Sequence, residues 1–161
     1  MAHPIMNGER GFTYPAALML VVVISVALTG AHQQWQTSVK RDREMELLFR
    51  GTQILEAINA YCRAGSEGEC QYPRRLEDLL KDPRVPGVRR HLRKLYKDPM
   101  TRDGHWGIVY DGRGNIKGVF SKSAGSPLKT GGFPDALKSF ENKAHYHEWK
   151  FVHNPRKETT S

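Results

Sequence analysis

The sequence lacks charged residues over one long stretch near its start. Between Phe12 and Val39 there is no Lys, Arg, Asp or Glu, and the preceding Glu9 and Arg10 cancel each other. The formal net charge of +8 therefore lies entirely within residues 40–161. The 161-residue chain thus divides into an uncharged apolar segment and a basic, water-soluble part the size of one small domain.

Common enzyme motifs are also missing. The sequence contains no nucleophile elbow, P-loop or HExxH pattern. The GRGN stretch at residues 112–115 is short and isolated, which favours a hairpin turn over a phosphate-binding loop. We therefore expect a protein that is not an enzyme, with no catalytic residue and no cofactor.

Cysteine is scarce as well. Cys62 and Cys70 are the only two, eight positions apart, and no CxxC spacing occurs. In an oxidising compartment they could close a small ring, which would stabilise the fold by about 2–3 kcal/mol. Free structural thiols are the alternative. Two thiols alone are too few ligands for a metal site.

The apolar segment is long enough to cross a membrane. Phe12 to Ala31 is 20 residues, and a membrane-spanning helix needs about 20. A secretory signal peptide has a shorter apolar core of roughly 7–15 residues before a small-residue cleavage site, which VALTGAHQ at residues 26–33 would offer. A generic membrane anchor is a further alternative. The following residues continue as a good helix, which argues against the signal peptide.

Apolar residues extend the helical pattern beyond the uncharged segment. They form one stripe with flanking neighbours: the stripe is Leu48, Gly51, Leu55, Ile58 and Cys62, and the neighbours are Leu47, Ile54 and Tyr61. Lys40 with Glu44, and Glu46 with Arg50, place opposite charges four residues apart on the expected solvent side. The pattern predicts one helix from about Phe12 to about Cys62, roughly 75 Å long.

Two shorter helices are expected in the basic part. YPRRLEDLLKDPR predicts one with Pro73 in its first turn, ended by Asp82-Pro83. The next begins near Pro86 and closes before Asp98-Pro99.

Three strands are expected after these helices. HWGIVYDGRGNIKGVFS predicts a β-hairpin around DGRGN. Asp135 to Phe140 predicts a helical turn, and HYHEWKFVH a closing strand with Trp149 and Phe151 on one face. The order of elements predicts an α+β fold in which a small antiparallel sheet covers the amphipathic half of the long helix.

The start of the apolar segment resembles a known processing signal. Gly11-Phe12-Thr13, after a short polar leader, resembles the type III signal of type IV pilins and type II secretion pseudopilins. The resemblance implies that a prepilin peptidase cuts between Gly11 and Phe12 and methylates Phe12, and that the apolar helix is retained for polymerisation. Most family members carry a Glu where this chain has Ala16. Pro15 fits a helix that starts at Phe12, because cleavage removes the carbonyl of Gly11 that its ring would strike.

Later stretches extend the resemblance. YPRRLEDLL, RHLRKLYKDPMT, WGIVYD, PLKTGGFP and HYHEWKF resemble a subgroup of pseudopilins related to the major pseudopilin. The resemblance implies a pilin-like fold with a leader (1–11), a transmembrane and polymerisation helix (12–39), a periplasmic globular domain (40–154) and a flexible tail (155–161). The partners it implies are other pseudopilin subunits in a helical filament, the prepilin peptidase and an inner-membrane assembly platform. The expected location is the bacterial inner membrane, spanned once, with the C-terminal domain in the periplasm.

Candidate metal ligands form weak patterns. His145, His147 and His153 alternate along the expected last strand, but ordinary surface histidines are the simpler interpretation. Major pseudopilins often bind calcium in a late loop. The corresponding stretch here, SKSAGSPLKTGGFPD, has Asp135 as its single acidic residue, whereas calcium takes several oxygen ligands. We therefore expect no metal site, and calcium finds no support in this loop.

Basic residues cluster in the two expected short helices. The members of this basic patch are Arg74, Arg75, Arg89, Arg90, Arg93 and Lys94. Such a patch fits DNA or an acidic partner of a minor pilin or membrane-tethered module. Glu77 and Asp78 interrupt it, and Tyr96 is almost the sole aromatic residue available for stacking on bases. A solvated face, or one complementary to acidic neighbouring subunits, is therefore favoured, with nucleic acid an unlikely partner.

Overall fold

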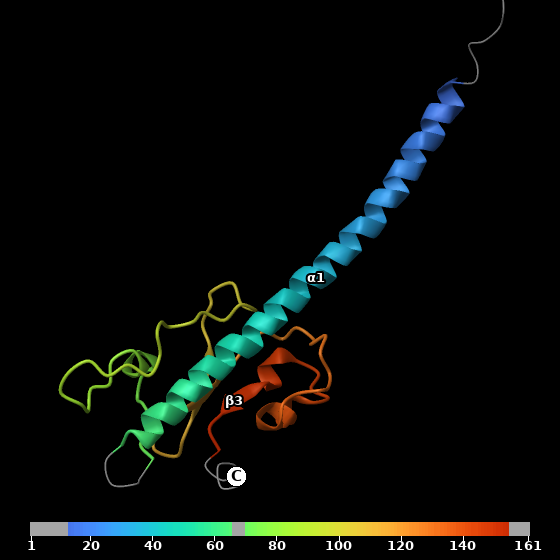
Figure 1. Cartoon of the computed structure of the whole chain (residues 1–161). Helices are drawn as coiled ribbons and strands as arrows, with labels where there is room; N and C mark the ends of the chain where they lie inside the picture. Colours follow the sequence, from blue (N-terminus) through green and yellow to red (C-terminus); the bar gives the residue numbers. More distant parts are fainter. Residues whose placement is uncertain (1–12, 66–69, 155–161) are drawn as a thin grey trace, which may run out of the picture. The chain divides into compact units, whose positions relative to one another are not determined.

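The protein contains one long helix and a small sheet. The structure, a computed structural model, describes residues 13–65 and 70–154, leaving out the side chains of residues 13 and 27–36. Helix α1 spans Thr13–Arg63, 51 residues (Figure 1). This agrees with the helix predicted from about Phe12 to about Cys62. The chain divides into two compact units, Met1–Lys40 and Arg41–Ser161, which are described separately.

The first unit consists, in its described part, of the N-terminal portion of α1. From residue 14 to residue 26 nearly every large side chain is apolar and exposed, with Tyr14 74% and Val26 70% exposed. Ser25, the one polar residue in this stretch, donates its hydroxyl to the carbonyl of Val21 at 2.7 Å, as helix-facing serines do in apolar surroundings. Among the described residues, no helix is both long enough and apolar enough to cross a membrane.

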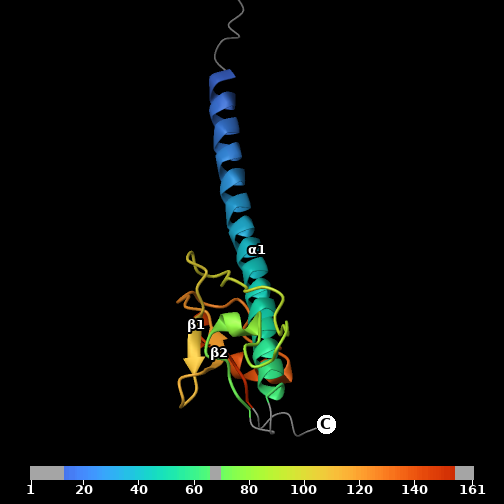
Figure 2. The same cartoon turned by 90° about the vertical axis from the view of Figure 1, so that its left-hand side faces the viewer.

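The second unit is an α+β domain. Strands β1 (Gly107–Tyr110), β2 (Ile116–Phe120) and β3 (Lys150–Val152) form an antiparallel sheet in the order β1-β2-β3. Ile108 pairs with Val119, and Val119 with Phe151. The hairpin and the three-stranded antiparallel sheet predicted from the sequence are confirmed. Figures 1 and 2 show the sheet alongside the C-terminal half of α1.

The core of this domain lies between α1 and the sheet. The predicted stripe and its neighbours supply one side of it. Ile58 of the stripe and the neighbours Leu47 and Ile54 are fully buried, whereas Leu48 and Leu55 of the stripe are half-buried. Gly51 lies at the closest approach of helix and sheet: a Cβ there would overlap the ring of Phe151. Aromatic rings complete the core and contact one another edge-on or stacked: Trp106, Phe133, Phe140, Tyr146, Trp149 and Phe151.

The two helices predicted in the basic part are wrong in extent or in kind. The first is a single 3₁₀ turn, η2 (Leu76–Leu79), and no helix forms over residues 86–98. The carbonyl of Leu79 accepts hydrogen bonds from the backbone N–H groups of His91 and Leu92, both at 2.9 Å. The N–H of Asp82 donates to the carbonyl of Arg89 at 3.0 Å. Long-range pairing thus occupies backbone groups that a helix would have used.

The closing strand is shorter than predicted. Residues 145–149 form a 3₁₀ turn, η4 (Tyr146–Glu148), and only β3 is extended. The carboxylate of Glu148 accepts hydrogen bonds from the N–H groups of Ala144 and His145, which closes the turn. Trp149 and Phe151 are nevertheless both fully buried, as their alternation predicts. The helical turn predicted for Asp135–Phe140 is present as the 3₁₀ helix η3.

Candidate functional site

Gly11 and Phe12, the predicted processing residues, are outside the described residues. Cys62, in the last turn of α1, forms a disulfide with Cys70, and their Cα atoms are 4.6 Å apart. That separation lies in the normal range for a disulfide. The bond joins the C-terminal end of the helix to the segment that leads into η2.

The predicted basic patch is exposed but is not helical. All six members are exposed, and none forms an ion pair with an acidic side chain among the described residues. Arg74 and Arg75 precede η2, and the other four lie in the irregular segment 80–98. The structure therefore presents two groups of solvated cations rather than one continuous helical face.

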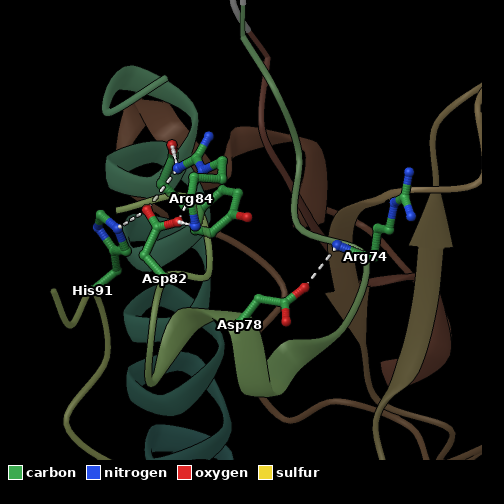
Figure 3. A network of polar contacts seen from close by, with 6 residues as sticks. Arg74, Asp78, Asp82, Arg84 and His91 are labelled. Atoms are coloured by element: carbon green, nitrogen blue, oxygen red, sulfur yellow. Dashed lines mark hydrogen bonds and ion pairs between the residues drawn. The ribbon is translucent and has the colours of Figure 1, made fainter. Parts of the chain in front are cut away.

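A polar network of Asp82, Arg84 and His91 lies beside the C-terminal end of α1 (Figure 3). Asp82 is fully buried, and its carboxylate accepts hydrogen bonds from Arg84 Nε at 2.9 Å, Arg84 Nη2 at 2.8 Å and the Arg84 backbone N–H at 3.0 Å. His91 Nε2 lies 3.0 Å from the same carboxylate. Arg84 Nη2 also donates to the carbonyl of Tyr61 at 2.8 Å, and the guanidinium stands 3.6 Å from the centroid of the Tyr61 ring. The network holds segment 82–91 against the end of α1.

Electrostatics in this network favour the ion pair. The hydrogen bonds from the Arg84 guanidinium hold the pKa of Asp82 well below its usual range, against the opposing effect of burial. The same pair raises the pKa of Arg84. Burial raises the pKa of the Tyr61 phenol, an effect that the charge of Arg84 partly offsets. Asp82 therefore stays ionised and Tyr61 stays neutral at physiological pH.

A hollow of about 910 Å³ adjoins the network. Three guanidinium-bearing residues line it, Arg74, Arg84 and Arg113, together with the acidic residues Asp78 and Asp111. Both acids are engaged by backbone N–H groups: Asp78 by two residues just before η2, and Asp111 by residues 113 and 115 of the hairpin turn. The charges of the hollow nearly balance, which suits polar recognition of a partner surface more than capture of a polyanion.

The sequence alone did not reveal this network. The Asp82-Pro83 pair was interpreted only as a helix end, and Arg84 and His91 received no role. The available signal was the spacing of Asp82 and Arg84, since an acid two residues before an arginine can accept both its backbone and side-chain donors. The partnership with His91 depends on tertiary pairing.

The position predicted for Glu44 is wrong. The sequence placed it on the solvent side, paired with Lys40, but it is only 3% exposed and lies within the core. Its carboxylate accepts 2.8 Å hydrogen bonds from the backbone N–H groups of Leu128 and Lys129 and from the hydroxyl of Tyr146. Burial and the bond to Glu44 raise the pKa of Tyr146. The predicted pair of Glu46 and Arg50 does form, at 2.7 Å.

The late loop considered for calcium is therefore attached to α1 by a carboxylate. Glu44 accepts hydrogen bonds from two backbone N–H groups of this loop, those of Leu128 and Lys129. The three alternating histidines do not share one face either. The rings of His145 and His147 stack 5.2 Å apart, and His153 lies beside Cys62.

No protein-family model, curated protein or solved structure matches this chain.

Proposed function

We propose that this chain is a structural, non-enzymatic subunit of a periplasmic pseudopilus, in a type II secretion or related type IV filament system that supports protein export. One observation carries the proposal. The described part of α1 before Lys40 exposes large apolar side chains around the whole helix from Tyr14 to Val26. A helix that is apolar all round requires a lipid or protein environment that removes it from water.

The processing signal explains how such a helix is kept. Gly11-Phe12-Thr13 directly precedes the apolar stretch, so cleavage after Gly11 leaves it at the start of the mature protein. The mature helix then serves first as a membrane anchor and afterwards as a polymerisation element among sister helices. The proposed location is the bacterial inner membrane, spanned once, with the C-terminal domain in the periplasm.

Assembly would exchange lipid contacts for helix–helix contacts. Because lipid tails are as apolar as leucine, the gain comes from close packing, which small residues favour. The sequence places such residues along the segment: Ala16, Ala17, Ala27 and Gly30. Ala16 lacks the carboxylate that typical subunits use to meet a neighbouring N-terminal amine, so docking of this subunit depends more on packing. That suits a divergent or minor subunit.

The C-terminal half of α1 supports a pilin-like arrangement of the domain. Its apolar stripe is covered by a three-stranded antiparallel sheet, and Glu44 attaches the late loop to the same helix. The loop and sheet are thereby fixed to one side of α1.

Intact-mass analysis tests the proposal. After co-expression with a prepilin peptidase, we expect the full chain to lose residues 1–11 and to gain one methyl group on Phe12. Gly11→Trp should block both changes, because the peptidase requires a residue without a bulky side chain before the cut. Ala2→Trp, a substitution of the same size within the leader, is the matched control. A mature chain that begins beyond Leu28, or normal cleavage of the Gly11 variant, would refute the proposal.

A second candidate is a DNA- or acidic-partner-binding module, as in a minor pilin. It is favoured by the exposure of all six basic patch residues. Retention on DNA should then weaken steeply with salt and fall in an Arg89→Gln/Arg90→Gln/Arg93→Gln variant, while Lys143→Gln leaves it unchanged. Equal retention of both variants would eliminate this candidate.

A further inference from the structure

Three potential metal ligands meet at the C-terminal end of α1. The ligand atoms of Cys62, Cys70 and His153 all lie within 4.8 Å of one another, and Cys62 Sγ is 4.0 Å from His153 Nε2. Cys62 and His153 are 6% and 3% exposed, whereas Cys70 is exposed. His153 is 91 positions away from Cys62 along the chain, so the fold alone brings it to the two cysteines.

The imidazole of His153 is held in a fixed orientation. His153 follows β3, and its backbone N–H donates to the carbonyl of Lys117 at 3.1 Å. On the ring, Nδ1 is hydrogen-bonded to the amide oxygen of Asn59, which can only accept, so Nδ1 carries the proton. The edge of the Tyr72 ring contacts the imidazole, with centroids 5.7 Å apart. Nε2 lies on the side of Cys62, 4.0 Å from its sulfur atom.

The hydrogen bond from His153 to Asn59 matches the one that orients a metal-bound histidine. Metal-bound histidines usually donate their second ring N–H to an oxygen acceptor, which fixes the tautomer and strengthens the ligand. Asn59 has that position relative to His153. We propose that Cys62, Cys70 and His153 bind a zinc ion when the disulfide is reduced, so that the two cysteines either form a disulfide or join His153 in a zinc site.

A zinc ion would require the two sulfur atoms, bonded to each other in the disulfide, to separate to about 3.8 Å after reduction. Zn–S bonds of about 2.3 Å and Zn–N bonds of about 2.0–2.1 Å place tetrahedral ligand atoms about 3.5–3.8 Å apart. The sulfur atom of Cys62 must therefore approach Nε2 by less than about half an ångström. Cys70 lines the hollow of about 910 Å³, which gives the ion access and leaves the fourth position to water.

Zinc binding follows reduction of the disulfide. Reduction adds two electrons and two protons to the S–S bond and yields two thiols, while a phosphine reductant is oxidised to its oxide with an oxygen atom from water. Binding of Zn²⁺ by both thiolates then releases the two thiol protons. The disulfide links α1 to Cys70 alone, whereas zinc also links both to the end of β3. After reduction, zinc would thus keep the end of α1, Cys70 and the end of β3 joined.

Cobalt substitution tests the site. The full chain in mild detergent is reduced with a phosphine under anaerobic conditions and titrated with Co²⁺. We expect one equivalent to give thiolate-to-cobalt charge transfer and the d–d bands of tetrahedral cobalt, and one equivalent of Zn²⁺ to abolish both. The oxidised chain should give neither. Absence of these bands from the reduced chain would overturn the proposal.

Two variants test His153 as a metal ligand and Asn59 as its hydrogen-bond partner. His153→Gln should weaken Co²⁺ binding at least about tenfold, and His147→Gln, at the exposed histidine of η4, should not change it. Asn59→Ala keeps all three ligands and should still weaken binding by about tenfold. It serves as the second variant if circular dichroism shows that His153→Gln is unfolded. Unchanged affinity in a folded His153→Gln or in Asn59→Ala would refute the assignment. The proposed filament function does not depend on these results.

Discussion

The two parts of α1 on either side of Lys40 use apolar residues in opposite ways. Before it, large apolar side chains from Tyr14 to Val26 are exposed on all sides of the helix. After it, apolar residues form one stripe with flanking neighbours, and among these Leu47, Ile54 and Ile58 are fully buried in the core that the domain's own sheet and aromatic residues complete. The apolar side chains of the second part are thus buried within the chain itself. Those of the first part require lipid or other protein chains to remove them from water, and this difference is the physical basis of the proposed assembly.

The strongest way to break the comparison is to place a charge in the first part. Val22→Asp should abolish filament assembly, because a carboxylate cannot be packed among apolar helices without a large desolvation cost. The thermal unfolding of the Arg41–Ser161 unit should stay as in the wild type. Negative-stain microscopy of filaments and thermal denaturation measure the two effects. Val22→Leu is the control, and filaments of Val22→Asp at wild-type density would contradict the assignment.

The reverse change is made in the second part. Ile54→Ala should lower the free energy of unfolding by about 2–5 kcal/mol, because it leaves a cavity in the core. Val22→Ala, which removes apolar atoms from an exposed position, should change the same quantity by less than about 0.5 kcal/mol. Urea unfolding followed by circular dichroism measures the free energy of unfolding of both variants. Similar losses in both variants would mean that the two parts of α1 do not differ as described.

The polar network around Asp82 should make the stability of the domain depend on pH. Because the folded-state pKa of Asp82 is depressed, its stabilising effect is complete above about pH 4, the usual value of an unfolded Asp, and is lost as the pH falls further. Asp82→Asn should cost about 3 kcal/mol at neutral pH, since it leaves the partly buried Arg84 without its counter-charge. It should also flatten the loss of stability below pH 4.

Unfolding midpoints measured from pH 7 to pH 2 test this expectation. The exposed Asp42, changed to Asn, is the matched control and should leave the acid profile as steep as in the wild type. An Asp82→Asn profile that runs parallel to the wild type would show that the network does not govern acid stability.

The smallest effect concerns the contact between helix and sheet. Gly51→Ala would normally stabilise a helix interior by about 1 kcal/mol. Here the added methyl group overlaps the ring of Phe151, so we expect a net loss of about 1–2 kcal/mol. In Gly51→Ala/Phe151→Leu the smaller side chain should restore part of the alanine advantage. A more stable Gly51→Ala single variant, in the same urea experiment, would mean that helix and sheet are less closely packed.

Where a local pattern decides the structure, the sequence was sufficient. The periodicity of the stripe with its neighbours Leu47 and Ile54 predicted which side of α1 is buried, and the DGRGN turn predicted the β1–β2 hairpin. The alternation of Trp149 and Phe151 identified two core residues, even though the strand containing them is short. Each of these features depends on residues that are neighbours in the sequence.

Where distant segments compete for the same groups, the sequence was insufficient. The helix predicted over residues 86–98 is absent because its backbone pairs with Leu79 and Asp82. Glu44 has the spacing of a surface ion pair, yet it is buried because a loop 84 residues later and Tyr146 supply its hydrogen-bond donors.

The sequence by itself determined the division of the chain, since the uncharged segment and the charge of +8 beyond it are properties of composition. It also determined the helical period of α1. Only the tertiary structure decided which polar groups are buried and which residues meet. Cys62 and Cys70 could be evaluated together from their spacing, but His153 joins them only through the folded chain. Burial of a polar group depends on partners that approach in space, and no local pattern encodes their approach.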